Sequence, residues 1–215
     1  MNKIIHEILQ YDVIIFDSDG VILDSNDIKT DAFYQSVKEF GENNAKKFVE
    51  YHINHTGNSR YEKFDYFFRN ILGRSIELKN KYITKYAELV HDLVTNAPIT
   101  TGCIDFLDLL DGKEKYVISG TDEKELRSIY RKKELDKYFK AVYGSPSTKI
   151  EIIENHISYL GKKILFIGDS LVDYEAAKAF SFDFMFISKY SHWEPNIQYN
   201  INYRLDTFED IRRKV

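Results

Sequence analysis

Three short, continuous apolar runs, each followed by a polar or small residue, constrain the fold of this chain most. They cover residues 13–16, 116–118 and 164–167, and they are followed by Asp17, by Ser119, and by Gly168 with Asp169. Runs this short are typical of strands that are buried on both faces of a parallel sheet. Two further runs, 141–143 and 184–187, are candidate strands of the same kind.

Helical patterns separate these runs. One such pattern is Ile150, Ile153, Ile157 and Leu160. Residues 174–180 are rich in alanine, which favours helix, and Ile104, Leu107 and Leu110 follow helical spacing. Alternation of strands and helices predicts an α/β fold, with a Rossmann-like core around a mostly parallel sheet.

The segment between the first two runs differs from the rest, because it contains only helical patterns. One stripe is Phe64, Phe67, Phe68 and Ile71, and another is Tyr82, Tyr86, Leu89 and Leu93. Pro98 disfavours helix at the residue before it, and the core pattern resumes after it. We therefore predict a core domain of residues 1–24 and 97–215, with a helical cap domain inserted at residues 25–96.

Composition narrows the class of partner only slightly. The 215 residues carry a net charge of −4, which gives no electrostatic case for nucleic acid or an anionic membrane. We find no signal peptide and no apolar stretch long enough to span a bilayer, so we expect a cytoplasmic protein by default. Cys103 is the single cysteine, so no intramolecular disulfide forms, and we expect it to pack in a core helix.

Carboxylates gather where the chemistry of such a fold is expected. In open parallel sheets, ligands bind beyond the carboxyl ends of the strands, which brings together Asp17, Asp19, Ser119, Asp169 and Asp173. Four crowded carboxylates raise one another's pKa unless a cation joins them. Oxygen ligands alone favour Mg²⁺, and a metal beside a carboxylate and a serine suits phosphoryl chemistry.

Four motifs together resemble the haloacid dehalogenase (HAD) superfamily, in the expected order and spacing. They are FDSDGV at 16–21, VISGT at 117–121, the lysine of SPSTK, which is Lys149, and GDSLVD at 168–173. Ser18 departs from the first motif, because relatives commonly have a bulky apolar residue there. That smaller side chain could reshape the pocket, but it removes no catalytic group.

The resemblance implies a covalent phosphoryl transfer. Asp17 would attack phosphorus and form an aspartyl-phosphate, while Asp19 would protonate the leaving oxygen and then deprotonate the attacking water. Ser119 and the amide of Gly120 would hold phosphate oxygens, and Lys149 would neutralise the nucleophile and the phosphate. Asp19 also argues against dehalogenation, since dehalogenase members usually lack this second aspartate.

Mg²⁺ is the cofactor that the resemblance implies. Asp17 and Asp169 would bind it together with the backbone carbonyl of Asp19. Asp173 would support the metal through water or orient the motif lysine. Asp173 also closes a capping box with Ser170, and the two roles are compatible. In a plainer interpretation, the first two aspartates form a turn and Ser119 only ends a strand.

The helical insert resembles the cap of the phosphoglycolate phosphatase and β-phosphoglucomutase branch. HTGNSRYEKF at 55–64 is similar to the cap loop that contacts the substrate there. Arg60 matches an arginine that grips a distal phosphate in the mutases, although a solvated loop residue is the alternative. Lys63 is a lesser candidate. His52 and His55 lack the spacing of metal ligands, and we expect them on the surface or at helix ends.

These observations predict a Mg²⁺-dependent phosphatase acting on a small phosphorylated metabolite, such as a phosphosugar or a phosphoglycolate-like acid. A β-phosphoglucomutase-type phosphomutase is the alternative, and a non-catalytic binding or regulatory protein is a third. Lys29 stands where the mutases have a histidine, and lysine is a poor neutral acid–base partner near pH 7, so we expect water to accept the phosphoryl group. The oligomeric state is left open, and the sequence is compatible with a monomer.

Overall fold

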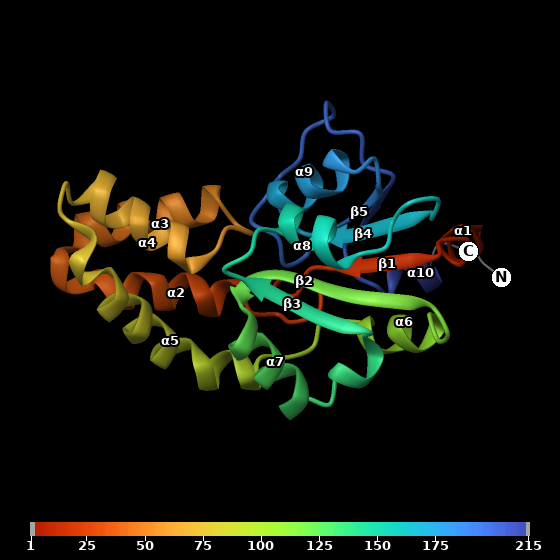
Figure 1. Ribbon diagram of the computed structural model, residues 1–215, viewed down its shortest axis with the longest axis horizontal. Coiled ribbons are helices and arrows are strands. Elements are labelled where there is room, and N and C mark those ends of the chain that lie inside the picture. Colours follow the sequence, from red (N-terminus) through yellow and green to blue (C-terminus); the bar gives the residue numbers. More distant parts are fainter. Residues whose placement is uncertain (1–2, 214–215) are drawn as a thin grey trace.

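A six-stranded parallel sheet forms the centre of the structure, a computed structural model that describes residues 3–213 (Figure 1). The strand order is β3-β2-β1-β4-β5-β6. The strands are β1 (Val13–Phe16), β2 (Glu114–Asp122), β3 (Ala141–Ser145), β4 (Ile164–Gly168), β5 (Asp183–Ile187) and β6 (Tyr203–Leu205). Every residue of β1 and β4 is buried, as expected for central strands covered on both faces. The predicted α/β fold is therefore confirmed.

Helices cover both faces of this sheet (Figure 1). Outside the insert they are α1 (Lys3–Ile8), α6 (Cys103–Leu109), α7 (Glu123–Lys132), α8 (Lys149–His156), α9 (Leu171–Ala179) and α10 (Asp210–Arg213). Side chains alternate along β1, so Ile14 and Phe16 join the apolar cluster of α6 and α7, while Val13 and Ile15 join that of α8 and α9. Cys103 is buried in the first cluster, as predicted.

The insert folds into a helical unit beyond the carboxyl ends of the strands, at the left of Figure 1. Its helices are α2 (Asn26–Val37), α3 (Glu42–Asn54), α4 (Arg60–Tyr66) and α5 (Lys79–Asn96). One-turn helical segments lie at Lys38–Phe40, Phe67–Ile71 and Ile76–Leu78 here, and at Asp136–Tyr138 in the core. Phe33 stacks on Tyr86 with ring centroids 4.1 Å apart, and Phe64 and Phe67 pack on Phe48. Each such pair adds about 0.5–1.5 kcal/mol beyond its buried area, which gives the unit an aromatic interior.

Two predicted apolar stripes are only half right. On α5, Tyr82 and Tyr86 are buried, but Leu89 and Leu93 are 38% and 54% exposed. The buried row continues instead through Val90 and Val94, because the helix packs along its i, i+4 ridge.

The second error concerns α8, which ends at His156. Leu160 therefore falls in a turn and is 86% exposed, and Ile150 also faces outward. Ile153 and Ile157 are buried as predicted, and Ile152 is buried beside them.

The edge strand β6 was not predicted from the sequence. The short strand β6 pairs with β5 in parallel, and its segment has no continuous apolar run. Among residues 3–213, no helix is long and apolar enough to cross a bilayer.

Candidate active site

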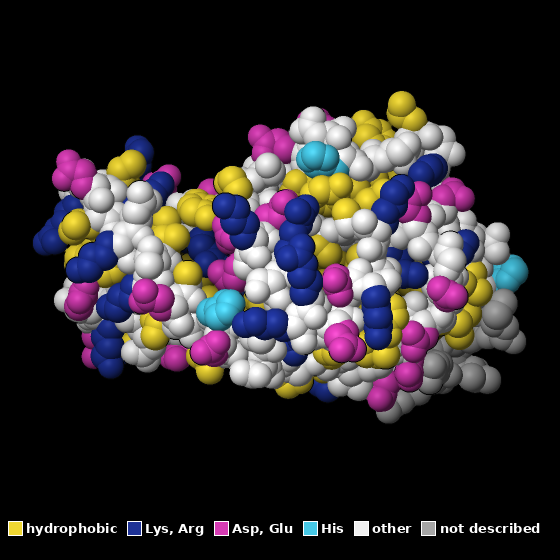
Figure 2. Space-filling view, turned by 60° about the horizontal axis from the view of Figure 1, so that its bottom comes forward, with side chains coloured by type: hydrophobic (Ala, Val, Ile, Leu, Met, Phe, Trp, Pro, Cys, Tyr) yellow, Lys and Arg dark blue, Asp and Glu magenta, His cyan; other side chains and the backbone are white. Residues whose placement is uncertain are grey.

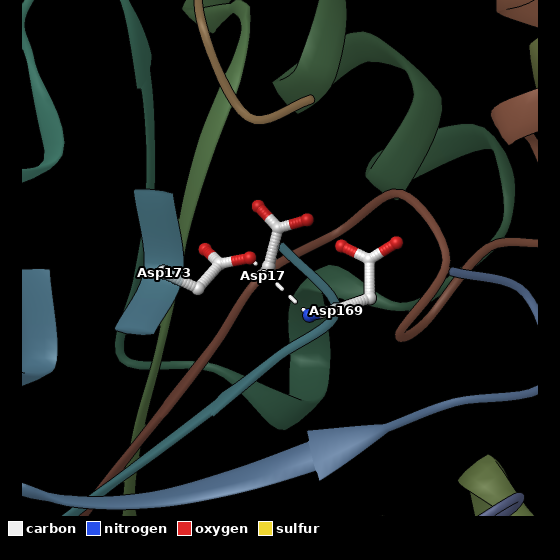
Figure 3. Close-up of side chains that lie close together, drawn as sticks. All are labelled: Asp17, Asp169 and Asp173. Atoms are coloured by element: carbon white, nitrogen blue, oxygen red, sulfur yellow. Dashed lines mark hydrogen bonds between the residues drawn. The ribbon is translucent and has the colours of Figure 1, made fainter. Parts of the chain in front are cut away.

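Asp17 and Asp169 lie side by side at the carboxyl edge of the sheet because they follow neighbouring strands. The amide of Asp17 donates to the carbonyl of Ile167, with 2.8 Å between nitrogen and oxygen. Figure 3 shows the carboxylates of Asp17 and Asp169 pointing to the same side, with Asp173 beside them. One oxygen from each of the three lies within 4.8 Å of the others, and all three residues are buried.

Lys149 joins two of these carboxylates. It stands in the first turn of α8, and its Nζ lies 2.5 Å from Oδ1 of Asp17 and 2.5 Å from Oδ1 of Asp173. Burial alone would lower the pKa of Lys149, but the charges of the two aspartates raise it above its usual value. The lysine is therefore a permanent cation that holds one oxygen of Asp17 in place.

Asp173 also caps α9. Its Oδ2 accepts hydrogen bonds from the amides of Asp169 and Ser170 and from the Ser170 hydroxyl, at 3.2, 3.0 and 2.6 Å. Ser170 in turn accepts from the Asp173 amide, which completes the predicted capping box. Asp173 thus caps its helix and orients Lys149 at once.

The buried carboxylates carry more negative charge than the nearby lysine offsets. Burial raises the pKa of Asp17 to about 7, with Lys149 opposing the rise and Asp173 and Asp19 adding to it. Burial and the charge of Asp17 raise the pKa of Asp169 well above its ordinary value. A bound cation would remove this repulsion, and an all-oxygen donor set suits Mg²⁺, so the residues present fit the implied metal.

Asp19 is held by a different set of partners. Its carboxylate accepts hydrogen bonds from Lys29 Nζ at 2.5 Å, from Ser25 Oγ at 2.6 Å and from Thr121 Oγ1 at 3.0 Å. Burial would raise the pKa of Asp19, but the charge and hydrogen bond of Lys29 outweigh it, so the pKa lies below its usual value. The lysine noted in the sequence therefore contacts the acid–base candidate directly.

Ser119 and Gly120 stand opposite the cap loop. Ser119 Oγ accepts from the amide of Thr121 at 3.1 Å. A Cβ atom on Gly120 would lie 2.4 Å from the carbonyl oxygen of Gly57 in the cap loop. Only glycine permits so close an approach, so the loop is pressed onto the predicted phosphate site.

Arg60 lines the cavity but binds the core. Its Nη1 and Nη2 lie 2.7 and 3.0 Å from the two carboxylate oxygens of Glu125 on α7. The guanidinium also stacks over the Tyr86 ring, 4.9 Å from its centroid. Arg60 is buried, so it is not the solvated loop residue that the alternative describes.

Lys63 and His52 also line the site, and the Nζ of Lys63 lies 2.8 Å from Nδ1 of His52. His52 lies in the last turn of α3, as expected for a residue at a helix end, but it is buried against Phe33, so the expectation of a surface position is wrong. It was missed because its partner comes from another helix. His55 is exposed and stacks on Tyr51, outside the site.

Two further residues were missed in the sequence. Asn26 Nδ2 donates to Oδ2 of Asp169 at 2.7 Å and to the carbonyl of Tyr190 at 2.8 Å, from the first turn of α2. No local pattern marks this residue. Thr121 could have been found, since it is the last residue of the SGT segment in the second motif. The unusual Ser18 has a partner too, because the Tyr130 hydroxyl donates to it at 3.0 Å.

One cavity of about 50 Å³ joins these groups. Its lining includes Asp17, Asp19, Asp169 and Gly120 of the core, and Lys29, Phe33, His52, Arg60, Lys63 and Tyr86 of the insert. Such a volume holds only a few water molecules. The helical unit therefore leaves little room above the carboxylates.

Comparison with known proteins identifies a family. The sequence profile described as haloacid dehalogenase-like hydrolase matches residues 14–187. No curated protein sequence matches the chain.

Solved structures share the whole fold at low identity. A haloacid dehalogenase-like hydrolase from Bacteroides fragilis is 20% identical, with a TM-score of 0.73 over 94% of this chain and 99% of that one. A predicted phosphoglycolate phosphatase from Haemophilus somnus is 19% identical, with a TM-score of 0.73 over 95% and 97%. CbbY from Rhodobacter sphaeroides, solved with phosphate, is 16% identical, with a TM-score of 0.72 over 94% and 96%.

Proposed function

Because the chain belongs to the haloacid dehalogenase-like hydrolase family, we propose that it is a Mg²⁺-dependent phosphatase for a small phosphorylated metabolite. The observation that carries the proposal is Lys149, which bridges Asp17 and Asp173 beside Asp169 in a closed, buried site. A lysine fixed on one oxygen of a carboxylate orients that carboxylate as a nucleophile. The enclosure keeps bulk water and large substrates away from it.

The reaction uses the two aspartates of the first motif in different roles. Asp17 attacks phosphorus, the bond from phosphorus to the leaving oxygen breaks, and Asp19 gives that oxygen a proton. Asp19 then takes a proton from water, which attacks phosphorus and releases phosphate from Asp17. Ser119 and the amide of Gly120 bind phosphate oxygens, while Lys149 offsets their charge.

We assign the metal to the carboxylates of Asp17 and Asp169 and the backbone carbonyl of Asp19. Asp173 supports this set by holding Lys149 and the start of α9. A Mg²⁺ ion held by these residues would supply positive charge next to the transferring phosphoryl group. Asn26 positions Asp169 through its 2.7 Å hydrogen bond.

We also propose that residues 25–96 form a cap that opens to admit the substrate onto a core of residues 1–24 and 97–215. The small cavity supports this, because a phosphorylated metabolite is larger than a few waters. The ion pair of Arg60 with Glu125 joins the two parts in the closed state.

A phosphosugar or a phosphoglycolate-like acid is the expected substrate. Among similar structures are a predicted phosphoglycolate phosphatase and CbbY complexes with phosphate and with xylulose-1,5-bisphosphate. Basic and acidic side chains are interspersed over the face seen in Figure 2, which does not suit a nucleic-acid partner.

The direct test is a panel of phosphorylated metabolites with Mg²⁺, in which released phosphate is measured. Hexose 1-phosphates should be included, with and without a bisphosphate activator, and hexose 6-phosphate should be followed as well. We expect phosphate release to exceed isomerisation. Lys29 stands where a mutase has a histidine, and its Nζ donates a hydrogen bond to the Asp19 carboxylate. Faster isomerisation would identify a mutase, and no reaction with any compound would contradict the proposal.

A further inference from the structure

Lys63 is a buried cation of the cap that lacks a carboxylate partner. It is 3% exposed and lines the same cavity as Asp17. The other cap cations of this cavity are paired, Lys29 with Asp19 and Arg60 with Glu125. Among residues 3–213, no ion pair joins Lys63 to an acid, and its Nζ lies 2.8 Å from Nδ1 of His52.

The hydrogen bonds of His52 show what Lys63 can offer. Burial lowers the pKa of His52 well below its ordinary value, so the ring is neutral. Its Nδ1 then accepts from Lys63, and its Nε2 donates to Thr30 Oγ1 at 3.1 Å, which itself donates to the carbonyl of Asn26. A lysine ammonium has three donors and His52 uses one, so two remain for a ligand in the cavity.

Such an arrangement is unfavourable for the protein alone. A cation taken out of water is costly unless it is paired, and burial followed by the charge of Lys29 lowers the pKa of Lys63 to about 7. An anion bound beside Nζ would restore the missing pair. Unfavourable local choices of this kind are expected where a ligand completes the structure.

We propose that Lys63, held by His52, binds a second anionic group of the substrate, so the substrates are small phosphate monoesters that also carry a carboxylate or a second phosphate. This inference rests on the proposed phosphatase function for the position of the reacting phosphate. Once the cap has opened and the cavity has widened around the substrate, phosphate at Asp17 and Gly120 would occupy its core end, and the second anion would occupy its cap end. Phe33 and Tyr86 line the cavity as well and contact the carbon skeleton between the two groups.

Arg60 cannot serve as this anion site while the cap is closed. Both terminal nitrogens of its guanidinium bind the two oxygens of Glu125. An anion there would have to displace a buried carboxylate, whereas at Lys63 it displaces none.

Two matched ligand pairs test the proposal. 3-Phosphoglycerate differs from glycerol 3-phosphate by a carboxylate, and glucose 1,6-bisphosphate differs from glucose 1-phosphate by a phosphate. Dissociation constants are measured by calorimetry with Mg²⁺ in the Asp17→Asn protein, which needs no turnover. We expect the more anionic member of at least one pair to bind about tenfold more tightly or better, the effect of a single charge-assisted hydrogen bond.

Lysine variants of the Asp17→Asn protein show whether the binding preference depends on Lys63 itself or on the overall positive charge of the cap. Lys63→Met should abolish the preference, and Lys63→Arg should retain it. Lys46→Met removes an exposed cap lysine that pairs with Glu42, and it should leave the preference unchanged. Equal binding within both pairs, or a preference that survives in folded Lys63→Met, overturns the proposal. If the proposed phosphatase function were wrong and this inference right, the Asp17→Asn protein would still bind the more anionic ligand more tightly. The wild-type enzyme would then release no phosphate.

Discussion

The core and the cap both bury charged side chains at one cavity, but with opposite surpluses. At the core edge, Lys149 pairs with the carboxylates of Asp17 and Asp173, and no ion pair among residues 3–213 reaches the neighbouring Asp169. Burial raises the pKa of Asp17 to about 7, and the charges of Asp173 and Asp19 add to this rise while Lys149 opposes it. A cation is what this side lacks.

The cap wall shows the reverse. Lys29 and Arg60 reach across to carboxylates of the core. Among residues 3–213, the Nζ of Lys63 contacts no carboxylate, and it lies 2.8 Å from the neutral His52 ring and 5.3 Å from the centroid of the Phe33 ring. An anion is what this side lacks. The comparison teaches that the two ligands we propose, a metal cation at the core and an anionic substrate group toward the cap, would each supply the charge that one side of the site lacks.

Removal of the metal should have the largest effect. Dialysis against EDTA should abolish phosphate release, and Mg²⁺ should restore it, because the charge of the transferring group and of the carboxylates would otherwise be uncompensated. Mg²⁺ should also raise the free energy of unfolding, by about 2.7 kcal/mol at a hundredfold excess over its dissociation constant. Asp169→Asn should weaken this stabilisation. Full turnover after rigorous metal removal would disprove the claim that the core side of the site needs a metal cation.

Lys149→Met should destabilise the protein by about 3–5 kcal/mol, since it leaves Asp17 and Asp173 buried without their cation. Urea unfolding at pH 7 measures this loss. Protonation of the aspartates at lower pH should reduce the loss. Stability equal to that of the wild type would mean that the core carboxylates do not depend on the lysine.

Lys63→Met should stabilise the protein, in contrast to Lys149→Met. The pKa of Lys63 is depressed to about 7 in the folded protein, so the unfolded chain binds more protons between about pH 7 and its ordinary pKa near 10.5. The free energy of unfolding of the wild type should therefore rise as the pH rises through this window. Lys63→Met should lack this rise. At pH 7 we expect the variant to be more stable by up to a few kcal/mol, judged from about 1.4 kcal/mol per pKa unit.

The groups that act on Lys63 come from several elements of the fold. They are His52, Lys29, Asp19, Glu62 and Asp169. A matched pH series with Lys46→Met controls for the general titration of the surface. Destabilisation by Lys63→Met would indicate a structural lysine and would remove the contrast with Lys149.

The smallest effect concerns the ion pair between cap and core. Arg60→Ala should raise KM by about tenfold and lower kcat less, if its main effect is on binding and closure. Glu125→Ala distinguishes two roles for Arg60. If Arg60 only joins cap to core, Glu125→Ala should raise KM similarly and the double variant should add nothing more. If Arg60 binds the substrate, Glu125→Ala should free it and lower KM.

Local patterns predicted the core edge well. β1 and β4 are continuous apolar runs, so the positions of Asp17 and Asp169 followed from strand ends that meet at one edge. The capping box of Ser170 and Asp173 was also predicted, because both partners lie within one helical turn. Lys149 required the family resemblance, since nothing near it in the sequence shows what it bridges.

Features that depend on distant partners could not be predicted. The pairing of Arg60 with Glu125 joins residues 65 positions apart, and Asn26 reaches Asp169 across 143. The buried face of α5 depended on the helices packed around it, which its own sequence does not specify. The charge on Lys63 was visible in the sequence, but the absence of a compensating acid is a property of the folded cavity.

The central claim is a covalent phosphoryl transfer to Asp17. Its most direct test is rapid quenching of the enzyme during turnover of its best substrate with Mg²⁺, followed by mass spectrometry of the peptide that contains Asp17. We predict a phosphoryl group on Asp17 that is lost without Mg²⁺, and no phosphopeptide and little turnover in Asp17→Asn. Phosphate release by Asp17→Asn at the wild-type rate, with an unmodified Asp17 in the quenched wild type, would contradict the account.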